Sequence, residues 1–355
     1  MKFPISASAL FLLTLSLTGL GAASPASAAA AGPPRYYVET GVNPRGAANF
    51  QGVVRARATG AITGTVRCPW RKSEVGRVAA ASHQIFFIDC VKTANDINST
   101  VLGSRIFRFH VTAAGRTDGY SRVPGGNFKT EPLSISASAN GADLALDVPT
   151  KAGRFQIIVI NVKTGAHAVW RNGVASTGEF FDGWEPSLTA NGKKLAVFGQ
   201  AFCPKGSKPG TCKSPGQEMR LVSPAMAGGT LASGRRVFKE SQLTNPSNGI
   251  IYDAFINAAG TAVTAGTVFG TANGSNFVEV LSVSAATGQR RRVEFKLNTS
   301  KAGFSYIFVR PDQSGRWVIF DAGPPSHLIN AWVDHGKFTR LKPIGALVNS
   351  EAWSS

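Results

Sequence analysis

Two carboxylates, Asp182 and Glu185, flank the dipeptide Gly183-Trp184 at the start of a run that should form a strand. Asp253 holds the equivalent place at the start of a similar run further along the chain. Paired carboxylates can supply the acid and the nucleophile or base of glycoside hydrolysis. The same residues can instead accept hydrogen bonds from backbone N–H groups where neighbouring elements meet, and we favour this structural interpretation.

Other catalytic patterns are missing from the sequence. It contains no G-x-S-x-G nucleophile elbow, no phosphate-binding loop, no G-x-G-x-x-G and no H-E-x-x-H. A histidine far in sequence from any other is typical of a turn or strand position rather than of a metal ligand or general base. All five histidines fit that description: His83, His110, His167, His327 and His335. We therefore predict no catalytic residue, no cofactor-binding residue and no metal site.

The four cysteines favour two disulfide bonds, because an even number in an exported protein is typical of a disulfide framework. Three pairings are possible. Nearness in sequence favours Cys203 with Cys212, across a loop rich in Lys, Gly and Pro, and Cys68 with Cys90. The alternative, a zinc site, would need closely spaced cysteines or paired histidines, which the sequence lacks.

The chain is strongly basic, with a formal net charge of +18. Such a charge attracts polyanions, although a solvated basic surface is the simpler interpretation. Lys205, Lys208 and Lys213, on or beside the Cys203–Cys212 loop, are possible polyanion contacts. Nucleic acid is an unlikely partner because few aromatic side chains are interleaved with this charge. Arg290–Arg292 and Arg235–Arg236 are expected on outer strands, where charge discourages edge-to-edge pairing.

The amino terminus has the features of a secretory signal peptide. Lys2 is followed by an apolar stretch from Ala9 to Leu20 and by Ala26-Ser27-Ala28, a small-x-small cleavage site. The alternative is a membrane anchor, but the apolar stretch is shorter than the roughly 20 residues that span a bilayer. We expect cleavage after Ala28, an Ala/Pro-rich leader over residues 29–35, one domain over 36–355, no later transmembrane segment and an extracellular monomer.

A repeated phrase organises the rest of the chain. Each copy is a strand, a turn with Asn-Gly or a related pair, and a second strand, which is a strong hairpin signal because both central residues of such a turn are expected at positive φ. A second hairpin, often turning at Thr-Gly, follows each copy. The four clearest copies are Pro132–Leu146, Pro186–Val197, Asp253–Ala265 and Phe308–Phe320.

Two hairpins per copy predict units of four antiparallel strands. Six units are expected to begin near Tyr36, Val75, Pro132, Trp184, Ile250 and Phe304. The first unit supplies only three strands, and a strand-like run within Ala346–Trp353 is left over at the chain end. The predicted fold is therefore an all-β propeller with six four-stranded blades, seven being the alternative, closed by the C-terminal strand joining the N-terminal blade. A β-sandwich would not be expected to repeat one phrase at such intervals.

The segments Leu133–Leu146, Pro186–Val197 and Pro311–Phe320 resemble the S-P-D-G-K-x-L-A-F phrase of TolB-type and WD-repeat-like β-propellers. The whole chain is similar to secreted actinobacterial proteins with degenerate propeller repeats. The resemblance implies a fold and a general role in binding, and it transfers no catalytic residue. Asn140 and Asn191 replace the aspartate of the phrase, so even that residue does not carry over.

The sequence is consistent with three functions. The first is a secreted non-catalytic scaffold that binds a protein or an anionic cell-envelope polymer, with its specificity in the loops. The second is a propeller enzyme, a lyase or glycosidase, with its site at the central channel. The third is a structural protein without a ligand. The first strand of each blade begins at the channel rim, so Asp182, Trp184, Glu185 and Asp253 are possible ligand contacts there.

Overall fold

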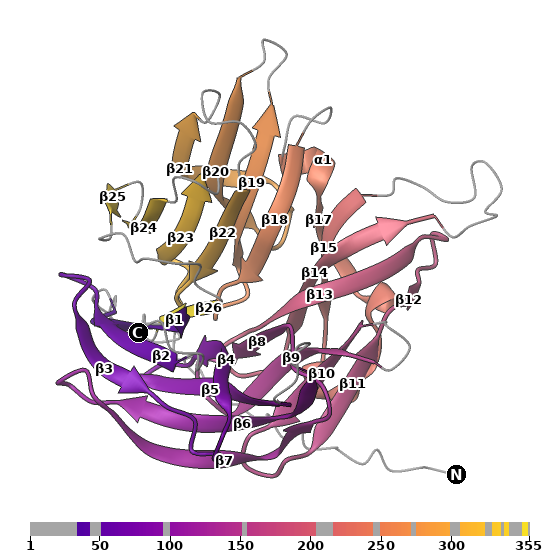
Figure 1. The fold of residues 1–355 in the computed structure, drawn as a ribbon. Coiled ribbons are helices and arrows are strands. Elements are labelled where there is room, and N and C mark those ends of the chain that lie inside the picture. Colours follow the sequence, from indigo (N-terminus) through magenta and orange to yellow (C-terminus); the bar gives the residue numbers. More distant parts are fainter. Residues whose placement is uncertain are drawn as a thin grey trace, which may run out of the picture. The chain divides into compact units, whose positions relative to one another are not determined.

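The computed structural model describes residues 34–42, 51–94, 100–150, 155–203, 216–243, 249–270, 275–298, 306–323, 329–334, 337–340 and 350–353. These residues are almost entirely β-strands and turns (Figure 1). The helical elements among them are α1 (Glu240–Leu243) and two single 3-10 turns. None of the described helices is long and apolar enough to span a bilayer. The predicted signal peptide and nearly all of the leader lie outside the described residues.

The strands form six hydrogen-bonded sheets. Sheet 1 has the order β26 (Ser350–Trp353), β1 (Tyr36–Val42), β2 (Gln51–Ala56), β3 (Ile62–Val66), and sheet 2 has β4 (Glu74–Ala80), β5 (Ile85–Thr93), β6 (Val101–Val111), β7 (Thr117–Phe128). Sheet 3 has β16 (Gly229–Thr230), β11 (His167–Arg171), β10 (Phe155–Asn161), β9 (Asp143–Pro149), β8 (Ser134–Ala137). Sheet 4 has β12 (Gly173–Val174), β13 (Phe180–Leu188), β14 (Leu195–Phe202), β15 (Gly216–Val222), β17 (Arg235–Lys239). Sheet 5 has β18 (Gly249–Ile256), β19 (Ala262–Gly270), β20 (Asn276–Ser284), β21 (Arg290–Asn298), and sheet 6 has β22 (Tyr306–Pro311), β23 (Trp317–Gly323), β24 (Ile329–Asp334), β25 (Lys337–Arg340).

Two features of this topology bear on the sequence predictions. β26 pairs antiparallel with β1, Tyr37 opposite Trp353 and Thr40 opposite Ser350, so the last strand of the chain lies beside the first (Figure 1). The prediction of four strands in every unit is wrong for sheets 3 and 4, which have five. The segment between β15 and β17 places β16 parallel to β11, and β12 adds a short pairing to β13.

The middle strands of sheets 2 to 5 are buried on both faces because each of these sheets lies between two others. In β5, Phe86 and Ile88 face an apolar cluster shared with sheet 1, whereas Phe87 faces a cluster shared with sheet 3. In β14, Leu195 and Val197 face sheet 3, and the alternate residues Ala196 and Phe198 face sheet 5. Five such clusters lie between consecutive sheets from sheet 1 to sheet 6. This burial on both sides is the main source of stability.

The repeated turn phrase has one geometry in all four copies. The glycine has a φ of 67–71° at Gly141, Gly192, Gly260 and Gly315, and its N–H bonds the carbonyl three residues earlier at 2.9 Å. The side chain of that earlier residue also accepts a hydrogen bond from a backbone N–H group. Ser138 Oγ accepts from the Asp143 N–H at 3.0 Å, and Asp312 Oδ1 accepts from the Trp317 N–H at 3.1 Å. The prediction of positive φ at both central residues is wrong, because Asn140 and Asn191 keep negative φ. Their side chains instead accept backbone N–H groups two residues on.

The innermost strands contact one another in the order β26, β4, β8, β13, β18, β22 and again β26. The turns that follow them are joined by backbone bonds, for example Asn140 N–H to the Ala190 carbonyl at 3.1 Å and Ala190 N–H to the Ala258 carbonyl at 2.7 Å. Gln313, in the last of these turns, donates to the carbonyls of Ala80 at 2.6 Å and Ala137 at 3.2 Å. A single amide side chain therefore links the turn of sheet 6 to sheets 2 and 3.

Truncation after residue 349, which removes β26, should destabilise the fold. β1 would lose four paired positions, and β4 and β22 would lose a neighbour. We expect the free energy of unfolding to fall by about 2 kcal/mol or more, since cross-strand pairs contribute about 0.2–1 kcal/mol each and exposed backbone hydrogen bonds add to the loss. Denaturant unfolding measures the change. Removal of residues 354–355 alone is the control, and equal stability of the two truncations would show that β26 does not hold the fold together.

Candidate functional site

Two regions of the structure gather charged side chains: the innermost strands of sheets 3 to 6 and a pocket between sheets 1 and 2. In the first region, Asp182, Trp184 and Glu185 lie on β13 and Asp253 lies on β18. Both strands carry a bulge, with register shifts between Trp184 and Pro186 and between Ile251 and Asp253. Glu185 occupies the first bulge with a φ of 47°, a left-handed conformation that is uncommon for a glutamate.

Asp253 joins sheet 5 to sheet 6. Its side chain is fully buried, and it accepts a hydrogen bond from the backbone N–H of Val309 at 2.8 Å. The same oxygen forms an ion pair with Arg310 Nη1 at 2.6 Å. This is the role that the structural interpretation of the sequence assigned to these carboxylates. A substrate cannot reach Asp253 in this conformation, because the side chain has no exposed surface.

Glu185 is held beside Asp253 and carries a strongly perturbed carboxyl group. Burial raises the pKa of Glu185 well above its ordinary value, and the neighbouring Asp253 raises it further, against the opposing effect of Arg310. The structure therefore brings together two of the predicted residues, Glu185 and Asp253. Trp184, by contrast, packs edge-on against Phe198, with ring centroids 5.7 Å apart, beside the apolar cluster between sheets 4 and 5.

Asp147, which the sequence analysis did not single out, belongs to the same region. It lies on β9 within an ordinary apolar strand, and burial together with the carboxylate of Asp182 raises its pKa to about 7. Its Oδ1 has no hydrogen-bond partner among the described residues. Asp182 accepts a hydrogen bond from Asn172. No three histidine, cysteine or acidic side chains in the described part of the chain are placed to hold a metal ion.

Another buried acidic side chain lies in sheet 2. Asp89 on β5 accepts a hydrogen bond from the Ser104 hydroxyl, and burial raises its pKa to about 8. Glu131, just before β8, adds to this rise by repulsion, and burial raises the pKa of Glu131 as well. Arg77 opposes both shifts. The raised pKa values of Asp89 and Asp147 favour the neutral form of these two buried acids.

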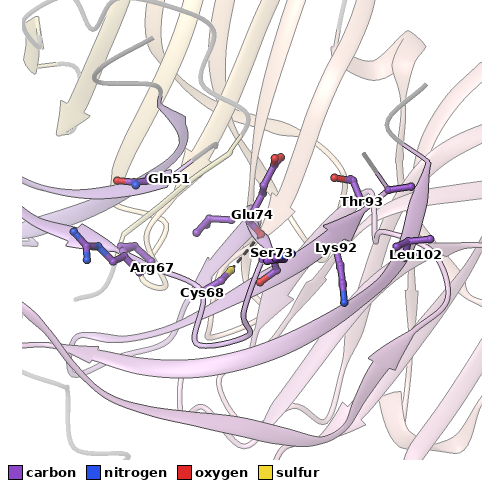
Figure 2. A pocket seen from close by; sticks show the side chains of 12 residues that line it. Gln51, Arg67, Cys68, Ser73, Glu74, Lys92, Thr93 and Leu102 are labelled. Carbon is purple, nitrogen blue, oxygen red and sulfur yellow. Dashed lines mark hydrogen bonds between the residues drawn. The ribbon is translucent and has the colours of Figure 1, made fainter. Parts of the chain in front are cut away.

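The pocket between sheets 1 and 2 has a volume of about 740 Å³. Figure 2 shows Arg67 toward one end and Lys92 and Leu102 toward the other, with Cys68, Ser73 and Glu74 between them. Lys72 also lines it, so three cationic side chains and one acidic side chain surround the space. Burial, followed by repulsion from Glu131, raises the pKa of Glu74 and so weakens the only negative charge in the lining.

The loop that carries Lys72 is anchored at both ends. Cys68 forms a disulfide bond with Cys90 on β5, with Cα atoms 5.6 Å apart, which confirms the predicted pairing. Trp70 in the same loop lies under two cations, Arg105 at 4.1 Å and Lys92 at 5.8 Å from the ring centroid. These contacts fix the wall of the pocket. Cys203 is also disulfide-bonded, whereas Cys212 and the predicted contacts Lys205, Lys208 and Lys213 lie outside the described residues.

The cations of this pocket differ from the arginines of the outer strands that are held by glutamates. Arg67, Lys72 and Lys92 take part in no ion pair within the described residues. On the outer strands, Arg236 pairs with Glu218 at 2.5 Å and Arg290 with Glu279 at 3.5 Å. Sequence reasoning missed the pocket because its residues come from five strands, β2 to β6, and from the loops that connect them. The clustering of Arg67, Arg71 and Lys72 around Cys68 was the signal that could have indicated it.

Mutation of Asp89 or Asp147 to asparagine should change how stability depends on pH. Both acids have a pKa in the folded state that is above the value in the unfolded state. Their contribution to the stability of the folded state is therefore fully present below about pH 4. It is lost as the pH rises through about 7 for Asp147 and about 8 for Asp89. We expect Asp89→Asn and Asp147→Asn to raise the melting temperature relative to the unmodified protein at pH 9 more than at pH 5. Asp118→Asn, at an exposed carboxylate, is the control. Melting curves that shift in parallel at all pH values would contradict this account.

Comparison with known proteins supports the fold and no specific family. No family model matches the sequence, and no curated protein matches it. Among solved structures, TolB from Acinetobacter baumannii is similar with a TM-score of 0.54 and 13% identity, over 90% of this chain and 67% of that one. A TolB-related structure from Agrobacterium tumefaciens gives a TM-score of 0.48 and 12% identity, over 90% of this chain and 94% of that one. The likeness to the first of these, together with the sheets described above, shows that the chain has the β-propeller fold.

Proposed function

We propose that this protein is a secreted, non-catalytic binding propeller that holds an anionic cell-envelope polymer in the pocket between sheets 1 and 2. The observation that carries the proposal is the group of three cations, Arg67, Lys72 and Lys92, that line one pocket without an ion-pair partner in the described residues. The net charge of +18 and the disulfide bond beside the pocket fit an extracellular site of this kind.

The energetics favour a polymer over a small anion. One exposed charge pair contributes about 0–1 kcal/mol, so three cations hold a single small anion weakly. A chain that bears many anionic groups rebinds before it diffuses away, and its apparent affinity rises through effective concentration. Such binding is also sensitive to salt, because the Debye length is about 8 Å at 0.15 M ionic strength. A third pocket, around Arg220 and Arg236, is a contrasting case, since Glu218 lies 2.5 Å from each of these arginines.

The proposal includes the architecture that presents this pocket. Each of the six sheets serves as one blade of a closed ring, and β26 completes the first blade. The cycle of contacts among the innermost strands and the pairing of β26 with β1 support this arrangement. We also propose secretion with cleavage after Ala28, a monomeric state, and a kinship with secreted actinobacterial propellers on the basis of the turn phrases. The cationic loop residues Lys205, Lys208 and Lys213 would add to the basic surface.

A glycosidase or lyase site at the central channel is the second candidate. The carboxyl groups of Glu185 and Asp147, with their raised pKa values, favour it, because a general acid must be protonated near neutral pH. Asp253 weighs against it, since its buried carboxylate bonds Val309 and Arg310. Release of reducing ends or unsaturated sugars from acidic polysaccharides, lost in Glu185→Gln, would support the enzyme and contradict a purely binding role.

Neutralising the pocket should weaken binding to a polyanion. The variant Arg67→Gln/Lys72→Gln/Lys92→Gln is compared with Lys129→Gln/Lys193→Gln/Lys194→Gln, which removes the same charge at exposed positions elsewhere. With poly(glycerol phosphate) at 50 mM NaCl, we expect the pocket variant to bind at least tenfold more weakly than the unmodified protein. The control variant should lose no more than about threefold, because distant charges are screened.

The measurement is a titration at 50 and 500 mM NaCl, with neutral dextran as a non-binding polymer. Equal losses in the two variants would show that net charge rather than the pocket determines binding. No binding of poly(glycerol phosphate) or polyglutamate at either salt concentration would overturn the proposed function. Tighter binding to single-stranded DNA than to either polymer would assign the site to nucleic acid instead.

A further inference from the structure

A second cationic pocket, with a volume of about 590 Å³, lies between sheets 2 and 3. Its charged lining consists of Arg108 on β6, Arg122 on β7 and Lys163 in the turn between β10 and β11. All three side chains belong to exposed residues. Ser121 adds a hydroxyl group, a type of group that donates hydrogen bonds to anionic oxygens, whereas the hydroxyl of Thr164 donates to Asn161 Oδ1 at 2.9 Å. No acidic residue lines this pocket.

The charge of this second pocket is not neutralised by its surroundings. Arg108, Arg122 and Lys163 form no ion pair with the rest of the described chain, and the only hydrogen bond of these side chains runs from Arg122 to Asn127 Oδ1 at 2.7 Å. A nearby acid, Asp143, is buried and is bonded by Asn161 Nδ2 at 3.2 Å. Burial raises the pKa of Asp143, which reduces its negative charge further.

The walls of the second pocket are held in place by contacts between the two sheets. His167 Nε2 lies 3.0 Å from the Gly125 carbonyl and links β11 to β7. The turn that carries Lys163 is closed by the Asn161 side chain, which accepts the backbone N–H of Thr164 at 3.0 Å. The three cations therefore project from a fixed frame, and the ordering cost of binding falls mainly on the flexible side chains.

The two pockets lie toward opposite ends of sheet 2. The first is lined by the end of β5 and by Leu102 at the start of β6, whereas the second is lined by Arg108 further along β6. The six residues from Leu102 to Arg108 span about 20 Å in an extended strand. This separation exceeds the Debye length, so each pocket attracts its own anionic groups.

We infer that the pocket of Arg108, Arg122 and Lys163 is a second binding site for the same class of ligand, a phosphate- or carboxylate-bearing glycopolymer. The inference rests on the proposed function of the first pocket and extends it. One molecule then holds two polymer segments, either two parts of one chain or two chains. Bivalent binding raises the apparent affinity for a long polymer far above that for a short oligomer and allows the protein to cross-link chains.

The test uses a glycerol phosphate dimer, too short to span the roughly 20 Å between the pockets, and long poly(glycerol phosphate), each titrated calorimetrically at 50 mM NaCl. The unmodified protein should bind two dimers. Arg108→Gln/Arg122→Gln/Lys163→Gln and the first-pocket triple variant should each bind one, and the Lys129/Lys193/Lys194 variant should still bind two. Each pocket variant should also bind the long polymer with an apparent affinity at least tenfold lower. Because it can no longer cross-link chains, it should not increase the turbidity of the polymer solution. Melting temperatures establish that the variants are folded.

The outcomes separate the two proposals. If the unmodified protein binds one dimer and the Arg108/Arg122/Lys163 variant binds it equally well, the second site does not exist and the first pocket stands. If only the Arg108/Arg122/Lys163 variant loses dimer binding, the second site exists and the proposed function of the first pocket is wrong. Two dimers bound to every variant would overturn both assignments.

Discussion

The structure depends on one packing constraint: a sheet that is apolar on both faces needs a neighbour on each side. In β5 and β14, alternate residues face opposite sheets, so neither face can be left to water without losing roughly 25 cal/mol for each Å² of apolar surface exposed. A linear stack of sheets would leave two such faces uncovered. In the closed ring proposed above these faces are covered, and β26, which pairs with β1 and contacts β4 and β22, is the strand that joins the two ends. The hydrogen bonds of Gln313 to Ala80 and Ala137 add a polar connection between the last sheet and the second and third.

The same packing constraint determines the environment of the charged side chains. A carboxyl group on an inner strand loses its water, and Asp89, Asp147 and Glu185 respond with raised pKa values rather than by acquiring cationic partners. Arginines on the outer strands β17 and β21 pair with glutamates of their own sheets, as Arg236 does with Glu218 and Arg290 with Glu279. Six cations without an ion-pair partner in the described residues line the two pockets: Arg67, Lys72 and Lys92 in the first, and Arg108, Arg122 and Lys163 in the second.

Local signals in the sequence were sufficient for the strands and turns, because each repeated phrase contains its own hairpin chemistry. Gly141 and Gly192 take the positive φ that the turn requires, and the side chains of Ser138 and Thr189 bond the backbone of their own turns. The disulfide bond between Cys68 and Cys90 could also be predicted, because the two cysteines lie close together in the sequence. Asp182, Glu185 and Asp253 could be singled out because they occupy equivalent positions in successive copies. Asp147 and the two cationic pockets could not be predicted, since each depends on which strands of neighbouring sheets meet. The bulge that turns Glu185 toward Asp253 depends on the register of strand pairing, which the sequence pattern does not give.

The distribution of rigid and mobile groups also bears on the choice between an enzyme and a binding protein. Catalysis needs preorganised polar groups that a substrate can reach. Here the carboxylate of Asp253 is fully buried and joins sheet 5 to sheet 6 through Val309 and Arg310. The groups that solvent reaches are arginine and lysine side chains on long flexible stems, which adapt to irregularly spaced anions but position no single bond for reaction. Exposed, unpaired and adaptable cations on a rigid frame suit the retention of a charged polymer better than its cleavage.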